Sequence, residues 1–143
     1  MVNKDLLVTR LDKLKGYVDF LESAKTHGQA QFVQDPYIHG ASERFLQLAV
    51  ECVIDISNHI ISDMRYRKPE SNRDIFNVLH ENGVIPFDLM ERLSDMASFR
   101  NILVHDYIKL DRVIVFDVIK NHLDDFRTFA RIISEPQPDQ PCL

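Results

Sequence analysis

Apolar residues recur at steps of three and four along almost the whole chain, and this periodicity constrains the fold more than any other feature. Such steps are typical of amphipathic helices, whereas a half-buried strand alternates apolar and polar residues, a pattern that is not evident here. The 143 residues can bury one hydrophobic core and are too few for two ordinary domains. We therefore expect one all-α domain, an up-and-down bundle of four long helices plus one short helix.

Caps and stops in the sequence predict where these helices begin and end. The expected helices span residues 4–25, 37–64, 71–83 (the short one), 86–105 and 111–134. Asp35 is a plausible cap before the first-turn proline Pro36, and Asp111 is the expected cap of the last helix. Ser71 and Asp74 have the spacing of a capping box, and Gly83 is the expected left-handed stop.

Two segments are expected to lie outside the helices. Residues 29–35 have the composition of a polar connection, and residues 135–143 have that of a flexible Pro-rich tail that carries no motif. The predicted domain organisation is therefore a helical domain over residues 1–134 followed by this tail.

The net charge of -5 and the pI near 5.6 argue against a protein that coats nucleic acid by long-range attraction. Any contact with RNA then has to come from a local patch of positive charge. The basic residues that could form one are Arg65, Arg67, Lys68 and Arg73. A short basic run of this kind is also typical of a solvated loop, and both interpretations stay open.

Cysteines, histidines and hydropathy limit the other classes of protein. Cys52 lies in a helical pattern and Cys142 in the tail, so they predict neither a disulfide framework nor a metal motif. His59, His80 and His122 lack metal-ligand spacing, and no metal or other cofactor is expected. Residues 45–61, the most apolar region, include charged residues, and no leader sequence is evident, so we expect a soluble cytoplasmic protein without a membrane segment.

The segment from Ser98 to Tyr107 combines apolar residues with groups that can bind phosphate and transfer protons. On a helix Arg100 and Tyr107 point almost the same way, and Asn101 and His105 are one turn apart, so these four side chains span one side of the helix end. The simpler interpretation is an ordinary helix C-terminus, with a cation and a histidine near the last carbonyl groups and a half-buried tyrosine.

Arg100, four intervening residues, His105, one residue and Tyr107 resemble the Arg-x4-His-x-Tyr signature of HEPN ribonucleases, with the usual polar Asn101 after the arginine. Further stretches that look like the HepT family cover most of the chain: residues 43–60, 71–83 and 122–126. The resemblance implies the HEPN fold and a metal-independent endoribonuclease toxin that acts as a homodimer on tRNA or mRNA. It also implies a nucleotidyltransferase (MNT) antitoxin that transfers AMP to the motif tyrosine, here Tyr107.

These residue types suit the implied chemistry. Imidazole titrates near neutral pH, so His105 could deprotonate a ribose 2′-hydroxyl or protonate the leaving 5′-oxygen without a metal ion. Arg100 could hold two phosphate oxygens and stabilise the negative charge of the transition state, and Asn101 could orient His105 or the phosphate. AMP on Tyr107 would exclude RNA by its bulk and charge.

Polar residues recur every four positions on the long helix over residues 37–64, which is otherwise apolar. This polar stripe consists of Glu43, Gln47, Glu51, Asp55 and His59. We expect Glu51 or Asp55 to face Arg100 and His105 and to orient one of those side chains. The alternative is that the stripe satisfies neighbouring helices or a dimer interface.

Two other functions stay open at the level of sequence. The chain could be a non-catalytic helical module that binds a nucleotidyltransferase or a nucleotide, since HEPN domains also have that role. It could also be a purely structural dimerisation bundle. Loss of RNA cleavage in His105→Ala would separate the ribonuclease from both.

Overall fold

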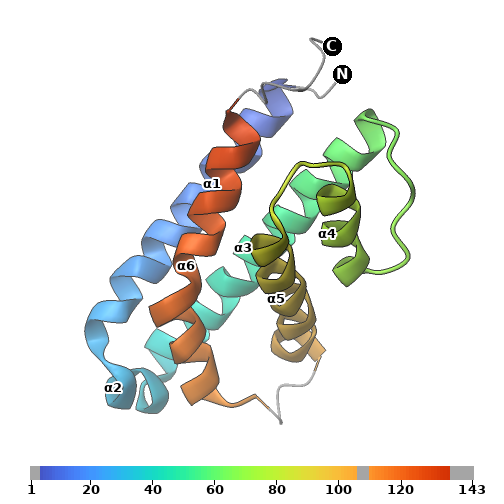
Figure 1. Ribbon diagram of the computed structural model, residues 1–143. Helices are drawn as coiled ribbons and strands as arrows, with labels where there is room; N and C mark the ends of the chain where they lie inside the picture. Colours follow the sequence, from blue (N-terminus) through green and yellow to red (C-terminus); the bar gives the residue numbers. More distant parts are fainter. Residues whose placement is uncertain (1–3, 106–109, 136–143) are drawn as a thin grey trace.

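The computed structural model describes residues 4–105 and 110–135, the side chain of His105 excepted. Within these residues the chain forms six α-helices and one 3₁₀ helix, and Figure 1 shows their order. They are α1 (Lys4–Ala24), η1 (Lys25–His27), α2 (Gln29–Gln34), α3 (Pro36–Asp63), α4 (Asn72–Glu81), α5 (Phe87–His105) and α6 (Arg112–Ser134). The predicted all-α bundle is confirmed, with α1, α3, α5 and α6 as its four long helices.

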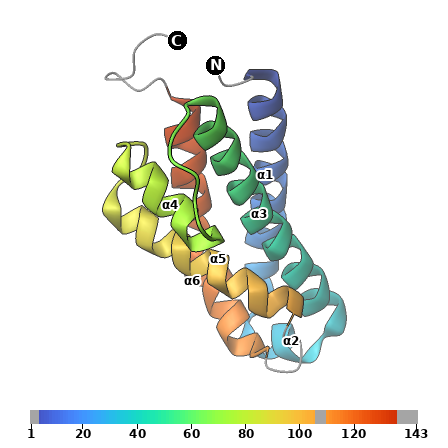
Figure 2. The same ribbon diagram turned by 90° about the vertical axis from the view of Figure 1, so that its right-hand side faces the viewer.

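Helix α3 is the centre of the bundle and contacts each of the other described α-helices. Helices α1 and α6 run along one side of it, and α4 and α5 form a hairpin on the other side (Figures 1 and 2). The start of α3, the end of α5 and the start of α6 lie at the same end of the molecule, opposite the chain termini.

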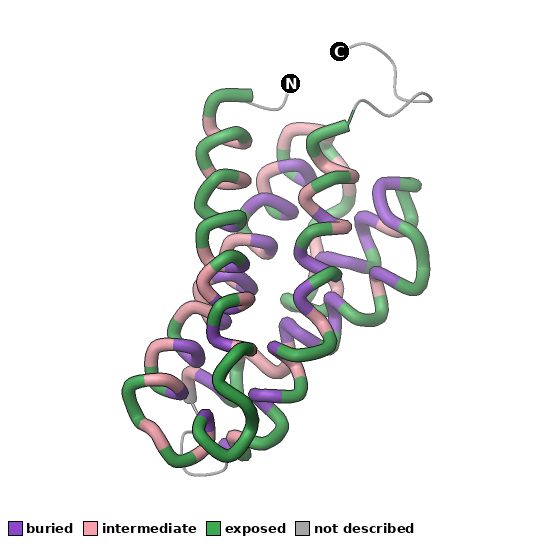
Figure 3. Tube along the Cα trace, turned by 90° about the vertical axis from the view of Figure 1, so that its left-hand side faces the viewer, coloured by how far each residue is buried: buried purple, intermediate pink, exposed green. Residues whose placement is uncertain are grey.

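The core lies between α3 and the helices around it, and Figure 3 shows buried residues on the inward faces of the helices. Its largest fully buried side chains are Phe32, Phe76, Phe126, Phe129, Leu14, Leu21, Leu46, Ile56, Ile75, Leu79, Leu89 and Leu93. Helix α3 is long and apolar enough to cross a membrane, but half of its most apolar stretch is buried inside the protein. Its apolar character is therefore accounted for by its place in the core.

Both ends of α3 have the local structure that fixes a helix boundary. The side chain of Asp35 accepts a hydrogen bond from the backbone N–H of Tyr37 at 2.9 Å, and Pro36 follows it, as predicted. At the other end Arg65 has a φ of 57°, and Tyr66 donates its backbone N–H to the carbonyl of Ile61 at 3.0 Å. This is a Schellman stop with an arginine at the left-handed position that glycine usually occupies.

The expected caps of α4 and α6 form, with one difference. Ser71 accepts from the backbone N–H of Asp74 at 3.1 Å, Gly83 has a φ of 74°, and Asp111 accepts from the backbone N–H of Val113 at 2.9 Å. The predicted partner of Asp74 in the capping box is wrong. Its carboxylate accepts the backbone N–H of Glu70 at 2.9 Å, where a capping box would use the backbone N–H of Ser71. This bond lies within the turn before α4, where the carboxylate also meets Arg67.

The prediction of a polar connection over residues 29–35 is wrong, because this segment contains α2. Helix α2 is held by Phe32, whose side chain is fully buried and packs against Phe116 with ring centroids 5.2 Å apart. A single buried aromatic ring stabilises a helix too short for its periodicity to be recognised. Of the predicted tail, only Glu135 lies within the described residues.

Candidate functional site

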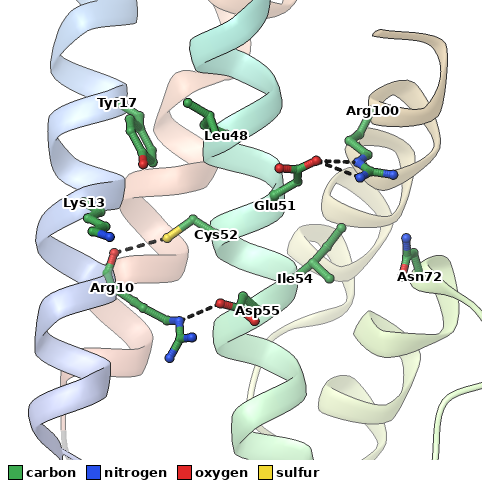
Figure 4. A pocket seen from close by; sticks show the side chains of 10 residues that line it. All are labelled: Arg10, Lys13, Tyr17, Leu48, Glu51, Cys52, Ile54, Asp55, Asn72 and Arg100. Carbon is green, nitrogen blue, oxygen red and sulfur yellow. Dashed lines mark hydrogen bonds and ion pairs between the residues drawn. The ribbon is translucent and has the colours of Figure 1, made fainter. Parts of the chain in front are cut away.

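Arg100 lies on the last two turns of α5, with its guanidinium directed at α3 (Figure 4). Its side chain is only 23% exposed. Its Nε and Nη2 atoms donate to the same carboxylate oxygen of Glu51, at 3.1 and 2.7 Å, and Nη1 donates to Oδ1 of Asn101 at 3.3 Å. Glu51 therefore occupies one edge of the guanidinium, and the edge formed by Nη1 and Nη2 keeps N–H groups that can bind a phosphate.

The carboxylate of Glu51 is held in its charged form. Partial burial acts to raise its pKa, but hydrogen bonds from Arg100 and Gln47 outweigh burial, and the pKa lies below its ordinary value. Gln47 lies one turn earlier on α3 and donates to the same oxygen at 3.1 Å. Two neighbours thus fix Glu51, and through it the orientation of Arg100.

The other motif residues are described only in part. Asn101 is exposed beside Arg100, and His105 is the last residue of α5, one helical turn after Asn101. The described part of the chain breaks off there, and Tyr107 lies outside the described residues. The expected alignment of Arg100 with Tyr107 on one side of a helix therefore stays a prediction, as do the roles of all four residues.

The other carboxylate considered for this site, Asp55, does not face Arg100. It pairs instead with Arg10 of α1, with Nε and the carboxylate oxygen 2.6 Å apart. Glu51 and Asp55 therefore bind arginines that come from opposite sides of α3 (Figure 4). Glu51 thus contacts Arg100, as expected for one of the two carboxylates, whereas Asp55 connects α3 to α1, as in the alternative that the sequence left open.

A pocket of about 410 Å³ lies beside Arg100 and reaches across α3 to α1 (Figure 4). It is lined by Arg10, Lys13, Tyr17, Leu48, Glu51, Cys52, Ile54, Asp55, Asn72 and Arg100. The thiol of Cys52 contacts the backbone carbonyl of Arg10 at 3.2 Å, and burial raises its pKa to about 11. Cys52 is thus a poor nucleophile at neutral pH.

Sequence reasoning missed the basic residues of α1. Arg10 and Lys13 lie one turn apart, and on an isolated helix charged residues at this spacing are typical of a solvated face. Only the packing of α1 beside α3 brings them into the pocket that contains Arg100. The polar stripe on α3 gave an indirect signal, because a carboxylate on an apolar helix predicts a cation on a neighbouring one.

Two of the four basic residues that follow α3, Arg67 and Arg73, are bound to neighbouring groups. Arg67 makes four hydrogen bonds to Asp74 and Glu81, at distances between 2.7 and 2.9 Å. The hydrogen bonds from Arg67 hold the pKa of Asp74 well below its usual range. Arg73 donates to the Ser94 carbonyl, Asp95 and Ser98. Four hydrogen bonds hold Arg67 and three hold Arg73, so a phosphate would have to replace several partners at either residue, which favours a structural role for both.

A buried polar cluster joins the start of α3 to the start of α6, and the sequence gave little signal for it. Arg112 donates from Nε to Nδ1 of His39 at 2.9 Å and lies 3.4 Å from Oε1 of Glu43. Burial raises the pKa of Glu43, and the nearby Arg112 and His39 oppose this rise only in part.

The histidines that the sequence excluded as metal ligands have other neighbours. His59 lies 3.4 Å from Asp63, His80 contacts the Ile85 carbonyl at 3.0 Å, and His122 lies 3.6 Å from Asp125. Within residues 4–105 and 110–135, no three His, Cys, Asp or Glu side chains cluster in a way that could hold a metal ion.

Known proteins similar to this chain share its length and its fold. The sequence is 34% identical over 129 residues to the mRNA nuclease HepT of Shewanella oneidensis, covering 90% of this chain and 96% of that protein. It is 27% identical over 129 residues to the tRNA nuclease HepT of Aphanizomenon flos-aquae, covering 90% and 88%.

Solved structures of HepT-type proteins are also similar to this chain. A tri-AMPylated Shewanella oneidensis HEPN toxin in complex with MNT antitoxin superposes with a TM-score of 0.84 at 33% identity, covering 90% of this chain and 96% of that one. Bacillus subtilis YutE, at 23% identity and a TM-score of 0.80 over 92% and 88% of the two chains, shares the fold. The HepT-like family model (Ribonuclease HepT-like) matches residues 10–133. With the Arg-x4-His-x-Tyr motif in its sequence and a family match over most of its length, the chain belongs to the HepT-like ribonuclease family.

Proposed function

We propose that this chain is the toxin of a HEPN/MNT toxin–antitoxin pair and a metal-independent endoribonuclease. The observation that carries the proposal is the Arg100 guanidinium, which Glu51 binds along one edge while the edge beside Asn101 keeps N–H groups for a phosphate. An arginine that served only to end a helix would not need two donors fixed on a half-buried carboxylate.

In the proposed reaction His105 removes the proton of a ribose 2′-hydroxyl, and the 2′-oxygen attacks the adjacent phosphorus. The bond from phosphorus to the 5′-oxygen breaks, and that oxygen takes up a proton from a protonated His105 imidazole, either the one that acted as base or the one of a second protomer. The products are a 2′,3′-cyclic phosphate and a 5′-hydroxyl. Arg100 stabilises the extra negative charge on the phosphate oxygens, and Asn101 orients the phosphate or His105.

A homodimer would place two such motifs at one shared cleft. Support for it comes from large apolar side chains that are exposed near the motif end of the molecule, where α3 and α6 begin and α5 ends (Figure 1). They are Tyr37, which is 91% exposed, with Ile102, Val113 and Ile114. Exposed apolar groups gathered at one end are typical of a surface that another protein covers.

The relative solved with its MNT antitoxin is tri-AMPylated, which supports a nucleotidyltransferase partner for this chain. The proposed acceptor is the hydroxyl of Tyr107, two residues after His105. Added phosphate groups there would place negative charge beside the motif and repel an RNA phosphate. The proposed location is the cytoplasm, where tRNA and mRNA are both available as substrates.

The experiment is cleavage of total RNA by the purified chain in EDTA, beside His105→Ala and beside His27→Ala, a matched change at an exposed histidine of η1. Intact mass first shows whether the chain carries AMP. Cleavage that His105→Ala abolishes and His27→Ala keeps supports the proposal. An unmodified protein that cleaves no RNA would favour the alternative, a non-catalytic module that binds a nucleotidyltransferase or a nucleotide.

A further inference from the structure

The pocket beside Arg100 has a second basic wall on α1, which the motif does not include. Arg10 and Lys13 both line it, and in Figure 4 they stand on the opposite side of α3 from Arg100. One continuous pocket therefore has cations at both sides and the carboxylates of Glu51 and Asp55 between them.

The lining of this pocket is positive although the chain is acidic. Its charged residues are three cations, Arg10, Lys13 and Arg100, and two carboxylates, whereas the whole chain has a net charge of -5. In a concave site the local charge, more than the net charge, decides which ligand is attracted. The pocket is thus a local patch of the kind that an acidic protein needs in order to bind nucleic acid.

Arg10 is bound less firmly than Arg100 and can exchange its partner. The Arg10 and Asp55 side chains are 29% and 57% exposed, so their ion pair lies in contact with water. Exposed ion pairs contribute little to stability, and a phosphate can replace the carboxylate at small cost. Within the described residues Lys13 has no ion pair, which leaves its ammonium group available.

We propose that an RNA strand crosses α3 through this pocket, with Arg10 and Lys13 binding the phosphate groups next to the one held at Arg100. The inference rests on the proposed ribonuclease function and adds a binding surface on α1 to it. Because the cations stand on opposite sides of α3 with carboxylates between them, a chain of phosphates fits the pocket better than one compact anion. The apolar side chains of Leu48 and Ile54 also line the pocket, and a ribose or base can pack against them.

The ion pair between Arg10 and Asp55 provides a test, because substitutions of its two residues should change the affinity for RNA in opposite directions. If Arg10 binds RNA, Arg10→Ala weakens binding, whereas Asp55→Asn removes a competing carboxylate and strengthens it. If the pair only connects α1 to α3, both changes act on stability and neither acts on RNA. Lys13→Ala adds a third variant that breaks no ion pair in the described part of the chain.

The assay is fluorescence anisotropy of a labelled single-stranded oligoribonucleotide, measured at several salt concentrations with the full chain carrying His105→Ala, so that the RNA stays intact. Matched controls are Arg131→Ala and Lys120→Ala, which remove the same charges from exposed positions on α6. Thermal unfolding of each variant shows whether it is folded.

Arg10→Ala and Lys13→Ala are each expected to weaken binding about tenfold, as for loss of a charge-assisted hydrogen bond. Each should also reduce the slope of log K against log salt by about 0.7, the value for one phosphate contact to a single strand. Asp55→Asn is expected to tighten binding, and the two controls should bind like the parent.

Three results would overturn the inference: no binding by the parent, unchanged binding in Arg10→Ala and Lys13→Ala, or an equal loss in the controls, which would indicate net charge alone. Each result can be told from failure of the proposed function, because cleavage of total RNA by the wild-type chain in EDTA is scored separately. Cleavage that depends on His105 but not on Arg10 or Lys13 would keep the function and refute the α1 surface.

Discussion

Three hydrogen-bond donors converge on one carboxylate oxygen of Glu51, two from Arg100 and one from Gln47. The guanidinium is therefore fixed from the core helix α3. We propose Glu51 as a positioning residue, because its two hydrogen bonds from Arg100 fix the orientation of the guanidinium.

Glu51→Gln tests this positioning role. The amide keeps the shape of the side chain but loses the charge that holds Arg100, so kcat/KM for RNA cleavage is expected to fall about tenfold, a barrier change of about 1.4 kcal/mol. Most of the loss should appear in kcat, since the arginine is proposed to act on the transition state. Steady-state cleavage kinetics check this, with the exposed Glu91→Gln of α5 as control, and an unchanged kcat would contradict the role.

Arg65→Gly tests the backbone at the end of α3. Arg65 has a φ of 57°, a conformation that costs an L-residue roughly 1 kcal/mol and costs glycine almost nothing. The substitution is expected to raise the free energy of unfolding by about 0.5–1 kcal/mol in urea denaturation. It also removes a charge from the basic loop. A marked loss of RNA cleavage would therefore support the interpretation of that loop as an RNA-binding site.

Glu43 predicts a pH dependence of stability. Burial keeps its pKa above the ordinary value of 4.5, so the folded state retains this proton to higher pH than the unfolded chain does. The contribution is fully present below pH 4.5 and is lost as the pH rises from there through the folded-state pKa.

The measurement is urea denaturation of wild type and Glu43→Gln at a series of pH values. The free energy of unfolding of wild type should fall relative to Glu43→Gln as the pH rises above 4.5. A constant difference between the two proteins would show that Glu43 has the same pKa in both states.

Phe32→Ala tests how α2 is held. The ring is fully buried against Phe116, and its removal leaves a cavity that is expected to cost about 3–5 kcal/mol of stability. Because α2 has six residues and no other fully buried side chain, its backbone amides should lose hydrogen-exchange protection before those of α3. Val8→Ala, at a position 56% exposed, is the control and should change stability little.

The sequence predicted α3 almost to the residue. Asp35 and Pro36 fix its start through a cap and a proline that involve only neighbouring residues and do not depend on the rest of the fold. It did not predict α2, since one buried phenylalanine in six residues gives no period. The difference is physical: caps act within four residues, whereas Phe32 is stabilised by Phe116, which is distant in sequence.

The same division applies to the site. Helical spacing places Glu51 and Asp55 on one side of α3, but it cannot tell which neighbouring helix each carboxylate meets. That depends on how α1 and α5 pack, and the structure directs Asp55 to Arg10 and Glu51 to Arg100. Arg10 and Lys13 were not predicted as site residues for the same reason, because their position depends on how α1 packs against α3.

Glu51 and Asp55 lie on successive turns of one helix, so α3 fixes the distance between the two arginines that they bind. The two carboxylates are separated along the helix by about one helical pitch, roughly 5.4 Å, which varies little from one protein to another. Inserting one residue between the two carboxylates would turn one of them by about 100° and aim it away from its arginine. An insertion or deletion between residues 51 and 55 would therefore destroy the spacing, whereas a change of length outside α3 leaves the spacing of these two residues unchanged.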